Sequence, residues 1–142
     1  MIILDTDLIS ILQRGASAGA ELLLRKIDEA QVREPVVTSV ITYEEQIRGW
    51  FHAMSLCKAL TQQIPIYARL RSHAEYYSAH RLVDFDEAAA VEFQRLKRLK
   101  VRIGTMDLKI AAIALANNAS LWSRNLGDFR QVPGLRVEDV LG

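Results

Sequence analysis

Short apolar runs alternate along the chain with longer segments in which apolar residues recur every three or four positions. The short runs have the length of buried β-strands and fall at Ile2–Leu4, Val36–Val37, Ser120–Ser123 and Leu135–Val137, with a further candidate at Arg81–Val83. Helical spacing covers Leu8–Gln13, Ala18–Ala30, Thr42–Leu60, Gln62–Ala79, Glu87–Leu99 and Met106–Asn118. Strands that alternate with helices are typical of an α/β fold. We therefore predict a three-layer α/β/α protein with a central, mostly parallel sheet of four to five short strands.

Length and composition place the whole chain in one globular unit. Its 142 residues fit a single domain, and half of them are hydrophobic while a quarter are charged, which excludes intrinsic disorder. We expect one domain over residues 1–142. A single cysteine, Cys57, excludes an internal disulfide and a cysteine-rich zinc site. No apolar run reaches membrane-spanning length, so we expect a soluble, cytoplasmic protein that does not bind membranes.

Acidic residues gather at the predicted starts and ends of elements. Asp5 and Asp7 follow the first strand, Asn125 and Asp128 follow the fourth, and Asp107 opens a helix. Parallel sheets bind ligands in the crevice beyond the carboxyl ends of their strands, where these side chains would meet. Carboxylates brought together repel one another unless a cation neutralises them, and oxygen ligands alone favour Mg²⁺ or Mn²⁺. The candidate ligands are Asp5, Glu44 or Glu45, Asp107 and Asp128.

Four motifs follow one another along almost the whole chain. They are Leu4-Asp5-Thr6-Asp7, Thr42-x-x-Glu45-x-x-x-Gly49, Gly104-Thr105-Met106-Asp107-x-x-Ile110-Ala111-Ala112 and Ser123-Arg124-Asn125-x-x-Asp128-Phe129-x-x-Val132-Pro133-Gly134-Leu135. In this order they resemble the motifs of PIN-domain nucleases, in particular the VapC toxins of bacterial toxin-antitoxin pairs. Two positions depart from the family pattern: Gln46 replaces a residue that is more often apolar, and Asp7 one that is often Asn or Ser.

The resemblance implies a PIN-like fold and a magnesium-dependent endoribonuclease toxin that cleaves RNA phosphodiesters with a metal-activated water. It implies a small antitoxin protein as partner. It assigns catalysis and metal binding to the four acids Asp5, Glu45, Asp107 and Asp128, and supporting roles to Thr6 and Asn125.

Several of these side chains also have simpler explanations. We expect Asp7 rather than Asp5 to cap the first helix, because that helix is predicted to begin near Leu8. On a helix that begins near Thr42, periodicity alone would place Glu44 beside the apolar face, whereas the resemblance selects Glu45. We follow the resemblance.

A run of basic residues offers a second candidate contact with RNA. Arg95, Lys97, Arg98, Lys100 and Arg102 lie within eight positions, and the run is either a solvated helix face or a track for RNA phosphates. Lys and Arg number 18 against 17 Asp and Glu, a net charge of +1, so nucleic-acid contacts must come from such a local patch. Arg124, next to the acidic motif, is the better candidate for a direct phosphate contact.

Aromatic residues concentrate on the two long helical segments between Thr42 and Ala79. We expect part of this apolar surface to form a homodimer or to receive an antitoxin segment, and His73 and His80 to lie on the exposed side.

Two other functions remain open. Asp5-x-Asp7 after an apolar strand also resembles the start of a haloacid-dehalogenase phosphatase, although Ile9 stands where that family has Thr or Val. A non-catalytic, PIN-like module that binds RNA or regulates a partner is the other alternative.

Overall fold

The computed structural model describes residues 1–142 and contains one sheet of five strands. These are β1 (Ile2–Leu4), β2 (Val36–Ser39), β3 (Leu82–Val83), β4 (Ser120–Trp122) and β5 (Arg136–Glu138). Their order across the sheet is β3-β2-β1-β4-β5, and all neighbouring pairs are parallel. The predicted α/β fold with a parallel sheet of short strands is therefore confirmed.

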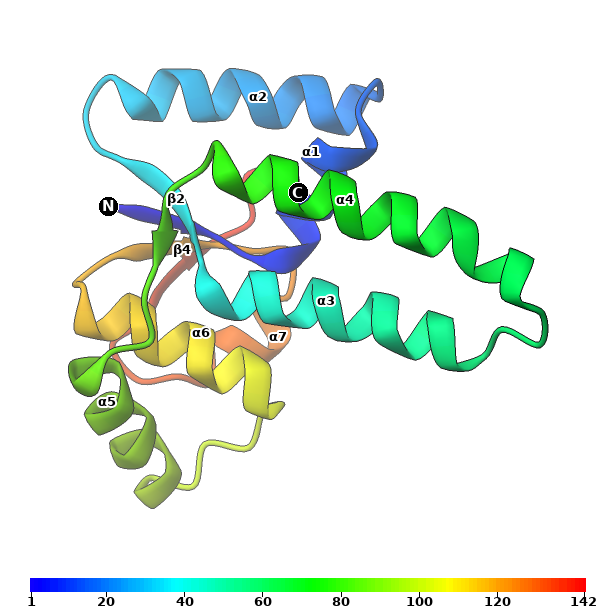
Figure 1. Ribbon diagram of the computed structural model, residues 1–142. Helices are drawn as coiled ribbons and strands as arrows, with labels where there is room; N and C mark the ends of the chain where they lie inside the picture. Colours follow the sequence, from blue (N-terminus) through cyan, green and yellow to red (C-terminus); the bar gives the residue numbers. More distant parts are fainter.

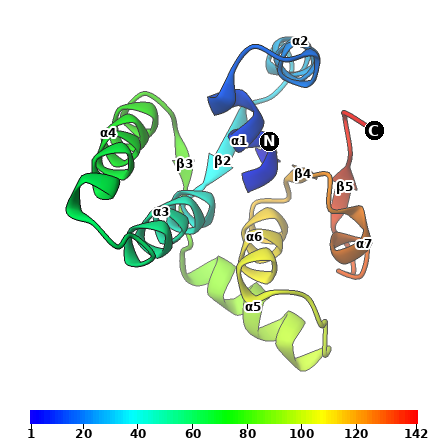
Figure 2. The same ribbon diagram turned by 90° about the vertical axis from the view of Figure 1, so that its right-hand side faces the viewer.

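Helices connect the strands and cover both faces of the sheet (Figures 1 and 2). They are α1 (Thr6–Arg14), α2 (Ala18–Gln31), α3 (Val40–Ser55), α4 (Ile64–Ser78), α5 (Glu87–Arg98), α6 (Thr105–Ala116) and the short α7 (Leu126–Phe129), with a 3-10 turn, η1 (Leu60–Gln63), before α4. No helix combines the length and the apolar character needed to cross a bilayer.

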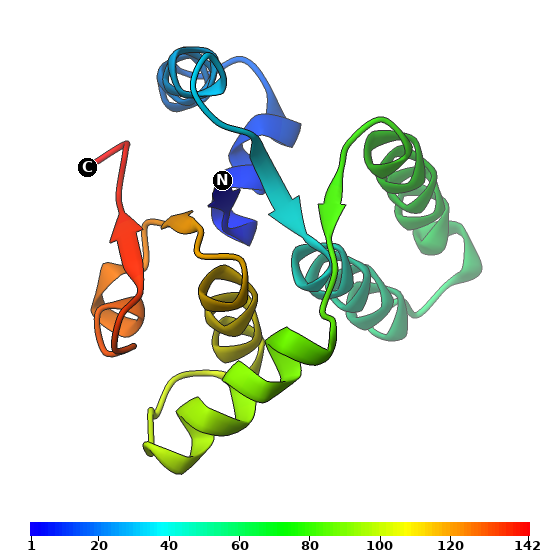
Figure 3. The same cartoon turned by 90° about the vertical axis from the view of Figure 1, so that its left-hand side faces the viewer.

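Alternating side chains of the strands fill two separate cores. Ile3 lies in the core beneath α5 and α6, whereas Ile2 and Leu4 lie in the core formed with α1 and α2. Figure 3 shows the resulting three layers, with α1 and α2 on one side of the sheet and α5 and α6 on the other. Helix α3 contacts both cores, because Ile41 belongs to the first and Tyr43 packs against the second.

The order of the strands reverses at β1. The chain passes from β1 outward to β2 and β3, and then returns to place β4 on the other side of β1. At such a switch point the connections leave in opposite directions and open a crevice above the carboxyl ends of the two central strands. Leu4 and Trp122 are partners in this pairing, so Asp5 and Ser123 emerge side by side into the crevice.

Several predicted helix boundaries differ from the structure by two residues or more, and local hydrogen bonds explain two of these differences. Helix α1 begins at Thr6, and its N-cap is Asp5, whose carboxylate accepts the backbone N–H of Thr6; the prediction that Asp7 caps it is wrong. Helix α3 begins earlier than predicted because the Ser39 hydroxyl accepts the N–H of Thr42. It also ends at Ser55 rather than Leu60.

Two histidines, one within helix α4 and one just after it, lie in different environments. His73 is buried, with 6% exposure, against the rings of Tyr43 and Tyr77, so the prediction that it is exposed is wrong. Its neighbours come from α3 as well as α4. The spacing of apolar residues along α4 alone does not predict a contact with α3. His80 is exposed, as predicted, and stacks on Tyr76 at a centroid distance of 4.1 Å.

Two adjacent leucines of α2 test the assignment of its buried face. Leu23 is fully buried whereas Leu24 is 52% exposed. We expect Leu23→Ala to lower the free energy of unfolding by about 2–4 kcal/mol, because it leaves a cavity in the core, and Leu24→Ala to lower it by less than about 1 kcal/mol. Urea unfolding of both variants measures the difference. Equal losses would show that α2 does not pack on the sheet through this face.

Candidate metal centre

Three carboxylates from separate elements meet above the carboxyl end of β1. Asp5 follows β1, Glu45 lies in the second turn of α3, and Asp107 lies in the first turn of α6. Each offers one oxygen, and these three oxygens all lie within 4.8 Å of one another. The crevice predicted from the strand order thus brings together three of the four acids named from the sequence. We call these three residues the acidic group.

Asp5 is the most deeply buried member of the acidic group, with 5% exposure. The Ser123 hydroxyl donates to its Oδ2 at 2.7 Å, and the N–H of Thr6 donates to its Oδ1 at 2.8 Å. Burial nevertheless raises the pKa of Asp5 from 3.8 to about 7, because these two hydrogen bonds only partly replace hydration of the charge. The site therefore holds a carboxyl group that gives up its proton at much higher pH than usual.

Glu45 is oriented by a pair of threonine hydroxyls. Thr6 donates to Glu45 Oε1 at 2.8 Å, and the hydroxyls of Thr6 and Thr42 lie 3.0 Å apart. Burial raises the pKa of Glu45, and the nearby charge of Asp107 raises it further. Glu44 does not join the acidic group; it pairs with Arg48 of its own helix at 2.7 Å. Of the two adjacent acids, the one selected by the resemblance is the one that lies in the crevice.

Asn125 joins Asp107 to Asp128. Its side-chain amide donates to Oδ2 of Asp107 at 3.3 Å and to Oδ2 of Asp128 at 3.1 Å. Burial raises the pKa of Asp107, and the charge of Asp128 adds to this increase. Asp128 therefore lies next to the acidic group but outside it, on the far side of the Asn125 amide.

Asp7 lies at the edge of the site. Its carboxylate accepts the N–H of Leu8 at 2.8 Å and the N–H of Arg124 at 3.3 Å, so it ties α1 to the loop after β4. Burial raises its pKa. It is not a member of the acidic group.

The acidic group has the charge and chemistry of a divalent-cation site. No Lys or Arg forms an ion pair with Asp5, Glu45 or Asp107, so the protein itself does not neutralise them. Burial raises the pKa of each of these carboxyls, and neighbouring carboxylates raise it further. Three carboxylate oxygens without nitrogen or sulfur ligands suit a hard cation such as Mg²⁺ or Mn²⁺.

Sequence reasoning missed Ser123 and Thr42 as parts of this site. Ser123 is fully buried and follows β4, just as Asp5 follows β1, so the rule about carboxyl ends of parallel strands identifies it once the two strands are known to be neighbours. Thr42 is also fully buried and reaches Thr6 across the helix pair. No signal in the sequence indicates that contact.

Of the predicted phosphate contacts, only Arg124 lies directly beside a residue of the site, since it follows Ser123. Arg124 is exposed in the loop after β4. Arg95 is paired with Glu92 at 2.9 Å, and Lys97 lies 5.7 Å from the centroid of the Phe93 ring. Arg98 ends α5 and forms no ion pair, and a short loop connects it to α6, which carries Asp107.

Known proteins share both the motifs and this architecture. A family model described as the PIN domain matches residues 2–135, nearly the whole chain and all three members of the acidic group. The chain belongs to the PIN domain family. A curated relative, plasmid stability protein StbB of Pseudomonas syringae pv. tomato, is 32% identical over 141 residues, which cover 96% of each protein.

Solved structures with this PIN-domain fold cover the chain from end to end. VapBC-1 from nontypeable Haemophilus influenzae superimposes with a TM-score of 0.69 and 25% identity, covering all of both chains. A toxin-antitoxin complex from Klebsiella pneumoniae contains a chain with a TM-score of 0.63 and 20% identity, over 99% of this chain and 98% of that one. Membership of the PIN family favours a nuclease over the haloacid-dehalogenase alternative.

The raised pKa of Asp5 makes stability depend on pH when no metal is bound. The folded protein keeps a proton up to about pH 7, whereas the unfolded chain releases it near pH 3.8, so stability falls as pH rises between these values. In EDTA we therefore expect Asp5→Asn to raise the free energy of unfolding by roughly 2–3 kcal/mol at about pH 8 and by much less at about pH 4. Denaturant unfolding at both values measures this. A variant that is destabilised equally at both would contradict the raised pKa.

Proposed function

We propose that this protein is a metal-dependent endoribonuclease toxin that hydrolyses RNA phosphodiesters. The observation that carries the proposal is the acidic group, three uncompensated carboxylates at the switch point of a PIN-domain sheet. A divalent cation held by these carboxylates would activate a water molecule, which favours direct attack of water on the phosphodiester.

Each residue of the site has a distinct role in this mechanism. Asp5, Glu45 and Asp107 would hold Mg²⁺ or Mn²⁺, with Thr6 fixing the orientation of Glu45. A divalent cation in such a site lowers the pKa of water and neutralises charge on the phosphate. Asn125 fixes Asp107 relative to Asp128, which we propose as the fourth catalytic acid.

Other residues would keep these carboxylates in position and bind the substrate. Ser123 holds the Asp5 carboxylate in place through a buried hydrogen bond. Arg124 is exposed next to the site and would contact an RNA phosphate, whereas the α5 residues Arg95, Lys97 and Arg98 would attract the RNA backbone from further away.

The proposed partners are an antitoxin protein and a second copy of the chain. The match to VapBC-1 along the whole chain supports a small antitoxin, and an RNA substrate places the activity in the cytoplasm. The hairpin of α3 and α4 extends away from the sheet (Figure 1), and its far end carries exposed apolar side chains. These are Phe51, Leu56, Leu60, Ile64 and Tyr67, all more than half exposed.

The activity is tested with purified protein freed of any partner, incubated with structured RNA. We expect cleavage with Mg²⁺ and none in excess EDTA. Glu45→Gln should lower the rate by roughly 10²-fold or more, because it removes a ligand, and Asp5→Asn and Asp107→Asn should abolish cleavage. The matched control is Glu44→Gln, which should cleave within about threefold of the natural protein.

Three results would contradict this mechanism. Cleavage that persists in EDTA would exclude a metal-dependent reaction. Full activity of Glu45→Gln together with loss of activity in Glu44→Gln would move the site to the other face of α3. Absence of cleavage with retained RNA binding would instead favour a non-catalytic PIN-like module.

The homodimer is tested through the exposed end of the α3–α4 hairpin. We expect sedimentation at micromolar concentration to show a dimer, because apolar side chains of this size gain free energy when they leave water. Replacing Leu56 and Ile64 together by Lys should produce a monomer. A natural chain that sediments as a monomer at high micromolar concentration would exclude a homodimer through this surface.

A further inference from the structure

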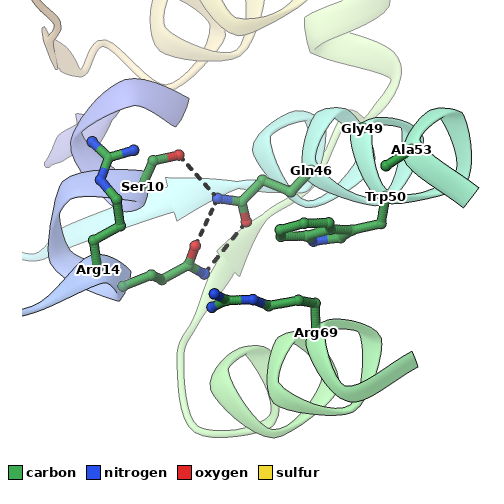
Figure 4. Close-up of a pocket in the computed structure, with 8 residues that line it drawn as sticks. Ser10, Arg14, Gln46, Gly49, Trp50, Ala53 and Arg69 are labelled. Carbon is green, nitrogen blue, oxygen red and sulfur yellow. Dashed lines mark hydrogen bonds between the residues drawn. The ribbon is translucent and has the colours of Figure 1, made fainter. Parts of the chain in front are cut away.

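A cleft of about 420 Å³ lies between α1, α3 and α4 (Figure 4). Ser10, Gln13 and Arg14 line it from α1, Gln46 and Trp50 from α3, and Arg69 from α4. Its volume is in the range of sites that bind small molecules. None of these residues belongs to the acidic group, and the PIN-domain motifs give them no role.

The charge of the cleft is positive. Arg14 and Arg69 are its charged lining residues, and neither forms an ion pair within the protein. No carboxylate lines the cleft. Guanidinium groups without an acidic partner are suited to phosphate, which they can bind through two parallel hydrogen bonds.

One wall of the cleft offers an aromatic ring. The Arg69 guanidinium carbon lies over the Trp50 ring, 6.0 Å from its centroid, so a positive charge faces one side of this flat surface (Figure 4). The small residues Gly49 and Ala53 flank Trp50 along the cleft, and a Cβ at Gly49 would meet no atom within 4 Å. This leaves open space in which a planar group can lie.

The other wall is built of polar side chains that hydrogen-bond to one another. The Gln46 amide is held by Gln13 at 2.9 Å, by Ser10 at 3.4 Å and by the Tyr77 hydroxyl at 2.6 Å. The adjoining hollow is lined by Gln13, Trp50 and Arg69 as well, and also by His73. Nε2 of this buried histidine has no hydrogen-bond partner, and burial of such an atom without one is unfavourable.

We propose that this cleft binds one nucleotide of a single-stranded RNA, with its base stacked on Trp50 and its phosphate held by Arg14 and Arg69. Unstacked bases of RNA loops are bound in this manner, by an aromatic ring together with groups that hydrogen-bond to the base edge. The inference rests on the proposed ribonuclease function, and it would define the substrate as RNA that is unpaired next to the cleaved bond.

The position of the cleft relative to the acidic group supports this assignment. Gln46 directly follows Glu45 in α3, and Ser10 and Gln13 lie about 6 and 10 Å further along α1 than Thr6, which binds Glu45. A strand with its reacting phosphate at the acidic group can therefore place a neighbouring nucleotide in the cleft.

Binding is tested first in EDTA, where no cleavage is needed. The chain has two tryptophans, and the other, Trp122, is buried with 6% exposure. We expect the four 5′-nucleoside monophosphates, or some of them, to quench the fluorescence of the natural protein, and Trp50→Ala to abolish this quenching. Arg69→Gln should weaken binding by on the order of tenfold, whereas Arg71→Gln, whose arginine pairs with Glu75 outside the cleft, should not.

The same variants are then tested in the cleavage reaction with Mg²⁺. We expect Trp50→Ala to raise KM for a single-stranded oligoribonucleotide by on the order of tenfold with little change in kcat, because the cleft binds RNA away from the reacting atoms. The control Leu24→Ala removes an exposed apolar side chain of α2, outside the cleft, and should leave KM unchanged.

These measurements separate failure of the cleft from failure of the proposed function. Absence of quenching by all four nucleotides, with KM unchanged in Trp50→Ala, would overturn the cleft assignment whether or not RNA is cleaved. Quenching through Trp50 in a protein that cleaves no RNA would support the cleft and overturn the ribonuclease. If nucleotides do not bind but Trp50→Ala weakens the complex with a co-expressed antitoxin, the cleft is a protein-binding site and the inference is wrong.

Discussion

Three carboxylates within 4.8 Å of one another repel, and the protein holds them together without a basic side chain at the site. The free energy for this arrangement comes from the surrounding fold. Asp5 is fixed by the end of β1, by the first N–H of α1 and by the Ser123 hydroxyl from the neighbouring strand. The order of the strands is what allows these three contacts at one point, because only the switch between β1 and β4 brings Asp5 and Ser123 together.

Helix α3 connects this site to the rest of the molecule. Its first turns belong to both cores, and its polar residues form two separate sets of contacts with α1. Thr42 and Glu45 bond to Thr6, while Gln46 bonds to Ser10 and Gln13 one and two turns later. The departure of Gln46 from the apolar residue usual in PIN domains thus has a structural explanation: its amide joins α1, α3 and α4 in a hydrogen-bonded network.

Much of the architecture could be predicted from the sequence because it depends on local patterns. The apolar runs located β1 and β4, and the acids beside them marked the crevice before any neighbour was known. Contacts between helices were not predictable in the same way. His73 was misplaced because Tyr43 of α3 covers it, and Ser123 was overlooked because its partner Asp5 is distant in the sequence.

The choice between Glu44 and Glu45 shows the same limit. Periodicity correctly placed Tyr43 and Ile47 on one face of α3, where both line a groove with Phe85, and Glu44 lies beside them. Glu45 lies on the opposite side of the helix, and only the contact with Thr6 of α1 shows that this side faces the crevice. The resemblance to PIN domains contained this tertiary information, whereas the spacing of apolar residues did not.

The helices that carry Asp107 and Glu45 differ in how firmly they are enclosed. Six residues of α6, from Leu108 and then Ile110 to Ala114, are buried, so this helix is surrounded by protein on all sides. In α3 only Ile41 and Thr42 are buried, and its distal half extends into solvent with α4. Local opening requires little free energy where few apolar contacts are lost. We therefore expect Asp107 to be held more rigidly than Glu45.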